Sequence, residues 1–437
     1  MTAATIASQV LAQEAHALLT RLERVKPFAL YEPMVPAAGI SPPAQIGIES
    51  YLAKGRRELR ELVHAYLRWL NGPQGRDATP AEMQRRFTFV RLRFNTVLAQ
   101  FDLFADALTQ RSEHETGVWL SGLDVVAADA LALPDYYRAP PVICYLDRGV
   151  GAAIRRARTR LPGGGENPVA IVRMPRERMI GSGIASSLVH EVGHQAAALL
   201  DLVNSLRSVL QQKLRQDRQP EQSVWRFWDR WISEIVSDFW SVARIGIGST
   251  LGLIGVVSLP RPFVFRINLG DPHPFPWIRV KLSCAIGNAL YPHPQWARMG
   301  QLWESFYPSA GLDEAKRNLL AKLEAGISDF IALLVGHRPP ALRGKSLAEV
   351  IGMAERQPAR LTALWQSWRN SPAILRTAAP SLVFAVIGQA RADGSISPEE
   401  ESQLLANLLT HWALRSTLDT ATLCASLPTA RLAAPVT

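Results

Sequence analysis

The sequence predicts a predominantly helical α+β fold, with a small sheet in the middle of the chain and helical regions on either side. Apolar residues recur every three or four positions through most of 1–120 and again through 301–437, which is typical of amphipathic helices. Two short β-rich runs, PPVICYL (140–146) and PVAIVR (168–173), interrupt this pattern. Since 437 residues exceed one ordinary domain, we expect three regions, with 121–300 as the central one.

Each element is predicted from its local pattern. Helices are expected at 6–25, 46–70 and 80–111, separated by breaks rich in proline and glycine. Between the two β-rich runs, the arginine-rich stretch 152–160 predicts a helix. The glycine triplet at 163–165 predicts a turn, because it lacks the spacing and the following Lys-Ser or Lys-Thr pair of a phosphate-binding loop.

The composition is that of an ordinary soluble protein, with 48% hydrophobic and 20% charged residues. The formal net charge of +10 comes largely from arginines scattered through the predicted helices. The chain has neither a run of basic residues nor a basic motif interleaved with aromatic residues. Solvated helix faces explain this charge better than a nucleic-acid surface, so no specific nucleic-acid partner is expected.

Cysteine usage and the N-terminal residues bear on the compartment. Cys144, Cys284 and Cys424 are odd in number and far apart, which argues against a disulfide framework. The first 25 residues lack the basic start and compact apolar core of a signal peptide. The uncharged stretch 245–260 contains four glycines and is shorter than the about 20 apolar residues of a membrane span. We therefore expect a buried helix there, no stable membrane insertion, and a cytoplasmic protein.

The segment 183–203 contains the pattern HExxH, as HEVGH at 190–194. Two histidines four residues apart on a helix lie on the same face, so His190 and His194 can share one metal ion. Glu191, beside the first histidine, can then reach a water on that metal. This pattern predicts a zinc site.

A second segment, WISEIVSDFWSVARIG at 231–246, supplies carboxylates at helical spacing. Glu234 and Asp238 lie one turn apart and share a face. Because a catalytic zinc has three protein ligands and one open position, Glu234 is expected to be the third ligand. Asp238 is placed to accept the spare ring N–H of a zinc-bound histidine and so fix its tautomer.

These two segments resemble the gluzincin metallopeptidases, the thermolysin-like and related zinc endopeptidases, in which HExxH is followed by a helix bearing ExxxD. The resemblance implies a zincin core, with a small sheet and an active-site helix, between the two helical regions. The 39 residues between His194 and Glu234 exceed the spacing of thermolysin itself. An inserted helix or loop around 211–222 is therefore expected.

A third element is NLGDPHPFPWIRVKLS at 268–283, in which His273-Pro274 is followed by Arg279. It resembles a segment of the CAAX-processing and heat-shock membrane endopeptidases and their soluble relatives, where a histidine-proline pair followed by an arginine lies near the zinc. The resemblance implies that His273 or Arg279 stabilises the oxyanion formed in amide hydrolysis. His293, in a second histidine-proline pair, competes for this role, and the spacing of Arg279 favours His273. The alternative is a proline-rich loop with a surface histidine.

Near the C-terminus, ADGSISPEE (392–400) looks like half of an EF-hand loop. The first and third ligand positions would be Gln389 and Arg391, which supply no carboxylate, so calcium is not expected. The segment resembles more closely the ADGxIxxxE turn of tellurite-resistance TerB-like helical domains, at about 380–415. A turn in which Ser397 caps the following helix explains it equally well.

Together these residues predict a zinc-dependent peptidase, most simply an endopeptidase of the gluzincin type acting on a peptide or protein. Glu191 would take the proton of a zinc-activated water and deliver it to the leaving amine. The alternative is a catalytically silent, zinc-stabilised scaffold whose helical flanks bind protein partners. Glu191 favours the enzyme, because a carboxylate at that position is unnecessary for holding zinc.

Overall fold

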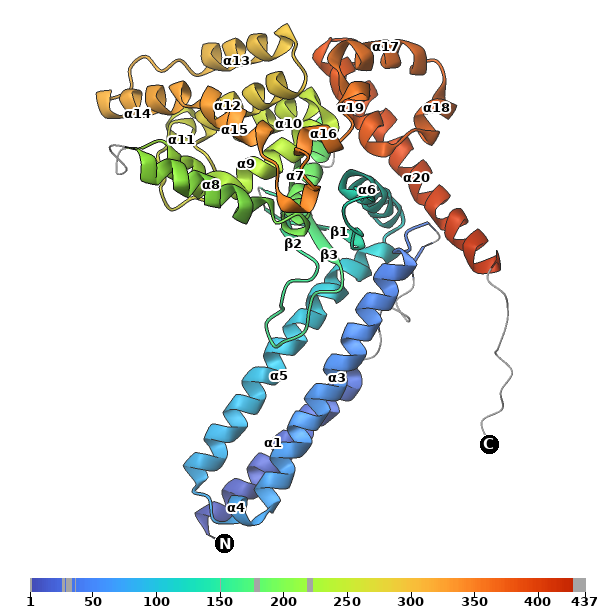
Figure 1. The fold of residues 1–437 in the computed structure, drawn as a ribbon. Helices are drawn as coiled ribbons and strands as arrows, with labels where there is room; N and C mark the ends of the chain where they lie inside the picture. The colour runs from blue at the N-terminus through green and yellow to red at the C-terminus, as the bar shows by residue number, and fades with distance from the viewer. Residues whose placement is uncertain are drawn as a thin grey trace.

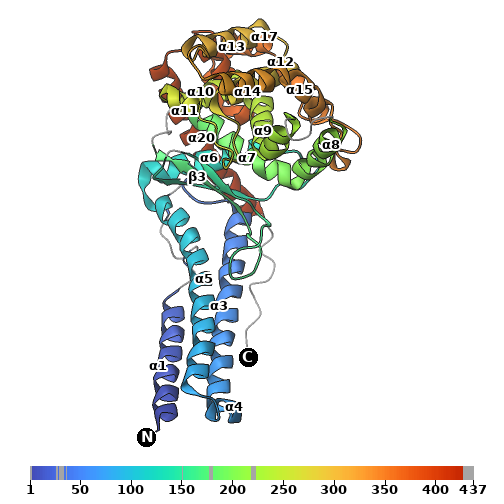
Figure 2. The same cartoon turned by 90° about the vertical axis from the view of Figure 1, so that its left-hand side faces the viewer.

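The computed structural model describes residues 2–25, 28, 34–35, 37–149, 151–176, 181–217 and 223–426. The predicted fold class, predominantly helical α+β, is confirmed. The chain forms a long helical arm and a larger helical head, and the sheet lies where the two meet (Figures 1 and 2).

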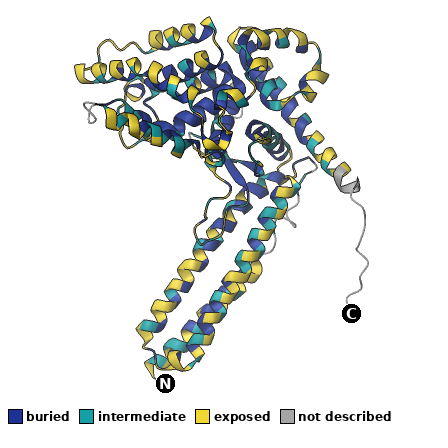
Figure 3. Cartoon of the chain, viewed as in Figure 1, coloured by how far each residue is buried: buried dark blue, intermediate teal, exposed yellow. Residues whose placement is uncertain are grey.

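The arm consists of three long helices that lie side by side, joined at its far end by one short helix (Figure 1). They are α1 (Ala3–Arg24), α3 (Pro42–Asn71), α4 (Pro73–Arg76) and α5 (Pro80–Thr109). The three long helices confirm those predicted from the spacing of apolar residues. Their apolar stripes, which include Leu18, Val63 and Phe94, are buried against one another, while their outer faces are exposed (Figure 3).

A buried ionic network joins the arm to the head. It involves η1 (Gln110–Ser112) and α6 (His114–Leu131). Arg111 is fully buried, lies 3.0 Å from Asp124 and donates a 2.7 Å hydrogen bond to the carbonyl of Cys144. Asp124 in turn accepts a 2.7 Å hydrogen bond from the backbone N–H of Cys144. A buried charge needs such partners, so this network fixes the angle at which the arm leaves the head.

The sheet has three strands, β1 (Val142–Asp147), β2 (Ala153–Arg155) and β3 (Ala170–Pro175). Their order is β1-β3-β2, with β3 parallel to β1 and antiparallel to β2. Both predicted strands are confirmed. Ile143 and Ile171 belong to the core of the arm and Cys144 and Val172 to the core of the head, so both faces of the sheet are covered.

The predicted helix at 152–160 is wrong, because residues 153–155 form the edge strand β2. Arginine-rich stretches favour helices locally, but the open edge of β3 offers backbone groups that need partners, and this pairing outweighs the weak local preference. The predicted turn at 163–165 is confirmed. Its three glycines have φ values of 91°, 91° and 93°, which residues with a side chain rarely adopt.

The head is built from helices around one hydrophobic core. Five of them surround the site described below: α7 (Ser182–Leu199), α8 (Leu202–Gln216), α9 (Trp225–Ile245), α10 (Ile247–Val257) and α12 (Pro276–Leu290). The others are α11 (Arg261–Val264), α13 (Pro294–Phe306), α14 (Glu314–Ala325), α15 (Ile327–Gly336), η4 (Pro340–Leu342), α16 (Leu347–Val350), η5 (Met353–Arg356), α17 (Pro358–Trp368), α18 (Pro372–Thr377), α19 (Pro380–Ala392) and α20 (Pro398–Ser426). The core extends from Leu120 to Trp412, so helices on both sides of residue 300 share it.

The apolar stretch 245–260 forms α10, a buried helix, as predicted. Its Gly248 meets Gly388 of α19 so closely that a Cβ atom on Gly388 would lie 2.8 Å from the Cα atom of Gly248. The glycines therefore permit close helix packing. Across the residues that the structure describes, none of the helices combines the length and the apolar character that a membrane crossing requires.

The turn before α20 is a capping box. The hydroxyl of Ser397 accepts a 3.2 Å hydrogen bond from the backbone N–H of Glu400, whose carboxylate accepts one of 3.0 Å from the N–H of Ser397. The capping role of Ser397 is confirmed, while the TerB-like resemblance stays a prediction.

The cysteines follow the expectation where they can be described. Cys144 and Cys284 are buried and free. The side chain of Cys424 lies outside the described residues. The described pair therefore forms no disulfide framework.

Candidate metal centre

Helices α7 and α9 pack directly against each other and carry the predicted metal ligands. Gly193, inside the HEVGH segment, lies at their contact. A Cβ atom there would be 2.9 Å from the Cα atom and 3.0 Å from the carbonyl oxygen of Ser237. Because backbone cannot move aside as a side chain can, this contact requires glycine. The close approach of the two helices brings His190 and His194 to Glu234.

The long connection between His194 and Glu234 contains a helix, as expected. This is α8, which packs against the same α9 that carries Glu234. Residues 218–222, the end of the predicted insertion, lie outside the described residues.

His190, His194 and Glu234 form a three-donor cluster whose donor atoms all lie within 4.8 Å of one another. The Nε2 atom of His190 is 3.2 Å from one carboxylate oxygen of Glu234, and the Nε2 atom of His194 is 3.4 Å from the other. Ligands of a tetrahedral zinc ion, at about 2.0–2.2 Å from the metal, lie about 3.3–3.6 Å apart. The two histidine–carboxylate distances are of this size, so two imidazoles and one carboxylate could hold a metal ion here.

A second layer of side chains holds the histidines. One oxygen of Asp238 lies 2.8 Å from the Nδ1 atom of His190. Arg279 binds Asp238 with two parallel hydrogen bonds of 2.8 and 2.9 Å. The hydroxyl of Ser233 is 3.4 Å from the Nδ1 atom of His194. Such partners orient metal-binding histidines and fix their tautomers.

Of the two competing histidines, the structure brings His273 to the cluster. Its Nε2 atom lies 3.2 Å from Glu234. Its Nδ1 atom is 2.7 Å from Asp271, which also accepts a 3.0 Å hydrogen bond from the backbone N–H of His273. His293 instead caps α13, where its Nδ1 atom accepts a 3.3 Å hydrogen bond from the N–H of Gln295.

The charges of this cluster shift one another. Burial alone would lower the pKa of His190, but Asp238 and Glu234 raise it to about 9. Burial alone would raise the pKa of Glu234, yet hydrogen bonds from His190, His194 and His273 hold it well below its usual range. The pKa of Asp238 is likewise lowered against burial by Arg279 and His190. Without metal, the site therefore holds an ionised carboxylate pair and a protonated histidine.

Glu191, the predicted general base, is 8% exposed and lines a cavity of about 110 Å³. The side chains of His190, Asp238, His273 and Arg279 line the same cavity. Gly151 and Ala152, which precede the edge strand β2, also line it. The cavity thus brings together the predicted base, one of the three predicted metal ligands, His190, and the predicted oxyanion residues.

Three contributors escaped the sequence reasoning: Gly193, Ser233 and Asp271. Asp271 had a readable signal, because an aspartate two residues before a histidine can hold both its backbone N–H and its ring. Ser233 and Gly193 had none, since their importance depends on how α7 and α9 meet.

Comparisons with protein-family models, with curated proteins and with solved structures find no match to this chain. The resemblance to gluzincins therefore rests on the residues and their geometry alone.

Proposed function

We propose that this chain is a zinc-dependent peptidase of the gluzincin type. The observation that carries the proposal is the convergence of His190, His194 and Glu234, with His190 and the neighbouring Glu191 lining a cavity. A structural zinc site is closed by four protein ligands, whereas three ligands and a cavity are typical of a catalytic one.

In the proposed reaction, zinc held by these three residues would lower the pKa of a bound water and polarise the substrate carbonyl. Glu191 takes the proton of the water as it attacks the peptide carbonyl carbon. It then delivers that proton to the leaving amine. Its place in the lining of the cavity supports this role, because the carboxylate can then reach a water or substrate there.

His273 and Arg279 have different expected parts. His273 lies beside Glu234 with a ring nitrogen directed to the cluster, so it can stabilise the oxyanion of the transition state. The two hydrogen bonds of Arg279 to Asp238 favour a positioning role, in which Arg279 acts on His190 through Asp238.

The strand β2 supports a peptide as the substrate. It pairs on one side with β3 and ends the sheet, and the residues just before it line the cavity. An extended peptide can add to such an edge through main-chain hydrogen bonds, which bind it without regard to sequence. A cytoplasmic location is part of this proposal and is supported by the free, buried Cys144 and Cys284.

The alternative, a silent zinc-stabilised scaffold that binds partners through its helical flanks, makes no use of Glu191. A digest of casein and of a peptide library, with and without a chelator, tests the two. Cleavage that a chelator abolishes and added zinc restores supports the peptidase. A zinc-loaded protein that cleaves neither substrate would support the scaffold.

A further inference from the structure

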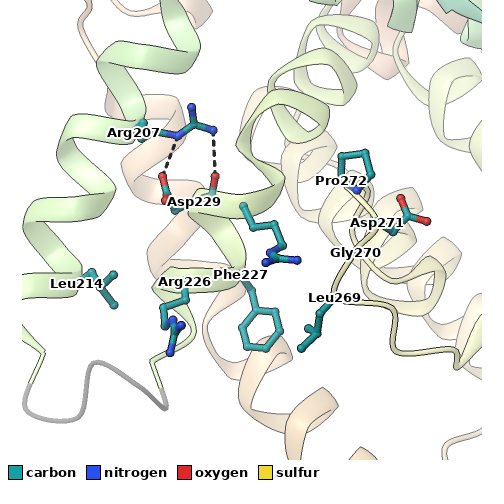
Figure 4. Close-up of a pocket in the computed structure, with 10 residues that line it drawn as sticks. Arg207, Leu214, Arg226, Phe227, Asp229, Leu269, Gly270, Asp271 and Pro272 are labelled. Atoms are coloured by element: carbon teal, nitrogen blue, oxygen red, sulfur yellow. Dashed lines mark hydrogen bonds and ion pairs between the residues drawn. The ribbon is translucent and has the colours of Figure 1, made fainter.

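A second, larger cavity of about 700 Å³ lies at the start of α9, the helix that also carries Glu234 (Figure 4). Helix α8, the start of α9 and the loop 269–272 form its walls. Asp271 belongs to this wall and also holds His273, which lies 3.2 Å from Glu234. Asp271 therefore links the wall of this cavity to a side chain beside the candidate metal centre, and the volume suits several side chains of a ligand.

The cavity and the metal centre share one stripe of α9. Arg226, Arg230, Glu234 and Asp238 follow one another at four-residue intervals, so each lies about 40° around the helix from the one before, and neighbouring members share a face. At about 1.5 Å per residue, Arg230 is about 6 Å and Arg226 about 12 Å from Glu234 along the helix axis. An extended peptide covers these lengths with about two to four residues. Arg226 and Arg230 line the cavity, whereas Glu234 belongs to the candidate metal centre.

The acidic side chains of the wall are already engaged. Asp229 is bound by Arg207 at 3.1 Å, as Figure 4 shows, and Asp271 is bound by His273. Arg230 is exposed and has no acidic partner among the residues that the structure describes. Its charge is therefore available to a ligand in the cavity.

The remaining wall is apolar. Leu214, Phe227 and Leu269 contribute to it, and the ring of Phe227 makes a tilted contact with Trp231 and an edge contact with Phe275. A guanidinium group next to such a wall suits a ligand with a carboxylate at the end of a short methylene chain.

From this arrangement we infer that the cavity is a substrate subsite for a carboxylate. It selects peptides with a carboxylate about two to four residues from the cleaved bond, and Arg230 is its specificity-determining residue. The carboxylate can be an acidic side chain or the C-terminus of the peptide. The inference rests on the proposed peptidase function, which supplies the cleaved bond as the reference point.

The first test measures selectivity in cleavage. For zinc-loaded protein, kcat/KM is compared for peptide pairs with Glu or Gln at each position around the cleaved bond. We expect wild type to prefer Glu at one position by about tenfold or more, the size of one charge-assisted hydrogen bond, and Arg230→Gln to reduce the ratio to about one. Arg215→Gln is the matched control, because Arg215 is an exposed arginine of α8 that does not line the cavity. It should keep the preference. A wild type without any acidic preference, or an Arg230→Gln variant that keeps it, overturns the inference.

The second test requires no cleavage. Zinc-loaded Glu191→Gln protein is immobilised, and two randomised peptide pools are passed over it, one with blocked ends and one with a free C-terminus. Enrichment of Asp and Glu in the retained blocked pool identifies an acidic side chain as the ligand, and retention of the free pool alone identifies the terminal carboxylate. Adding the Arg230→Gln substitution to the Glu191→Gln protein should abolish the retention of either pool. Acidic retention without cleavage by wild type would reject the peptidase and keep the subsite, whereas cleavage without acidic retention would reject the subsite. Retention of single-stranded DNA in place of acidic peptides would contradict the inference.

Discussion

Arg279 binds both oxygens of Asp238, and Asp238 in turn lies 2.8 Å from the Nδ1 atom of His190. The arginine that the sequence suggests as an oxyanion contact is thus connected to the metal ligand through one carboxylate. This relay leaves the Nε2 atom of His190 directed at Glu234.

The relay predicts that Asp238→Asn and Arg279→Gln weaken zinc binding by about 10- to 100-fold, because His190 loses the partner that orients it. A competition titration with a chromogenic chelator measures this. Arg261→Gln serves as a control, since Arg261 donates hydrogen bonds to the carbonyls of Pro308 and Ala310 and stacks on Phe265, none of which belongs to the site. Unchanged affinity in both site variants would refute the relay.

The raised pKa of His190 predicts that zinc binding depends on pH. Metal binds neutral imidazole, so below the metal-free pKa of about 9 a proton must leave as zinc enters. We expect the apparent affinity to increase by up to about tenfold per pH unit from pH 6.5 to 9 and then to level off. Affinity that is constant over this range would show that the site binds zinc without releasing this proton.

The same shifts predict the stability of the metal-free protein. The pKa of His190 is raised from 6.5 to about 9, so its stabilising contribution is complete below pH 6.5 and is lost as the pH increases through 9. The pKa of Asp238 is lowered from 3.8, so its contribution is present above that value and is lost in stronger acid. Urea unfolding from pH 3 to 10 should show a plateau of stability between about pH 3.8 and 6.5, followed by a decrease towards pH 9. His190→Gln should remove this alkaline decrease.

Gly193→Ala tests the contact that assembles the site. The added methyl group would press on the backbone of Ser237, separate α7 from α9 and destabilise the fold by about 1–3 kcal/mol. The matched control is Gly183→Ala in the same helix, where, among the residues that the structure describes, no atom beyond its own turn of helix lies within 4 Å of the added Cβ, and replacing glycine favours the helix. The melting temperature and the zinc affinity should both decrease in Gly193→Ala, and neither should decrease in Gly183→Ala. Equal behaviour of the two variants would mean that the close approach is unnecessary.

The two histidine-proline pairs are separated by kinetics. His273→Ala should keep zinc and lower kcat and kcat/KM together by about 100-fold, because the lost contact exists mainly in the transition state. His293→Ala should cleave at the wild-type rate and lose about 1 kcal/mol of stability, since it removes the cap of α13. Loss of zinc in His273→Ala would make His273 a ligand, and loss of cleavage in His293→Ala would contradict the assignment.

The helical arm and the members of the His190, His194 and Glu234 cluster could be predicted from the sequence because both depend on local spacing. Apolar residues at three- and four-residue intervals determine the arm, and the spacing of His190 and His194 determines the face that they share. The strand β2 could not be predicted, because its conformation comes from the edge of β3, which lies farther along the chain. The contribution of Gly193 and the cavity around Arg230 depend on how separate helices pack, which no local pattern records.

The most direct test of the account measures zinc and peptide cleavage together in wild type, Glu191→Gln and Glu234→Ala. We predict about one zinc per chain in wild type and in Glu191→Gln, cleavage by wild type alone, and no zinc in Glu234→Ala. An amide at residue 191 can lie beside the water but cannot accept its proton. Full cleavage by zinc-loaded Glu191→Gln, or a wild type that binds no zinc even on reconstitution, would contradict the account.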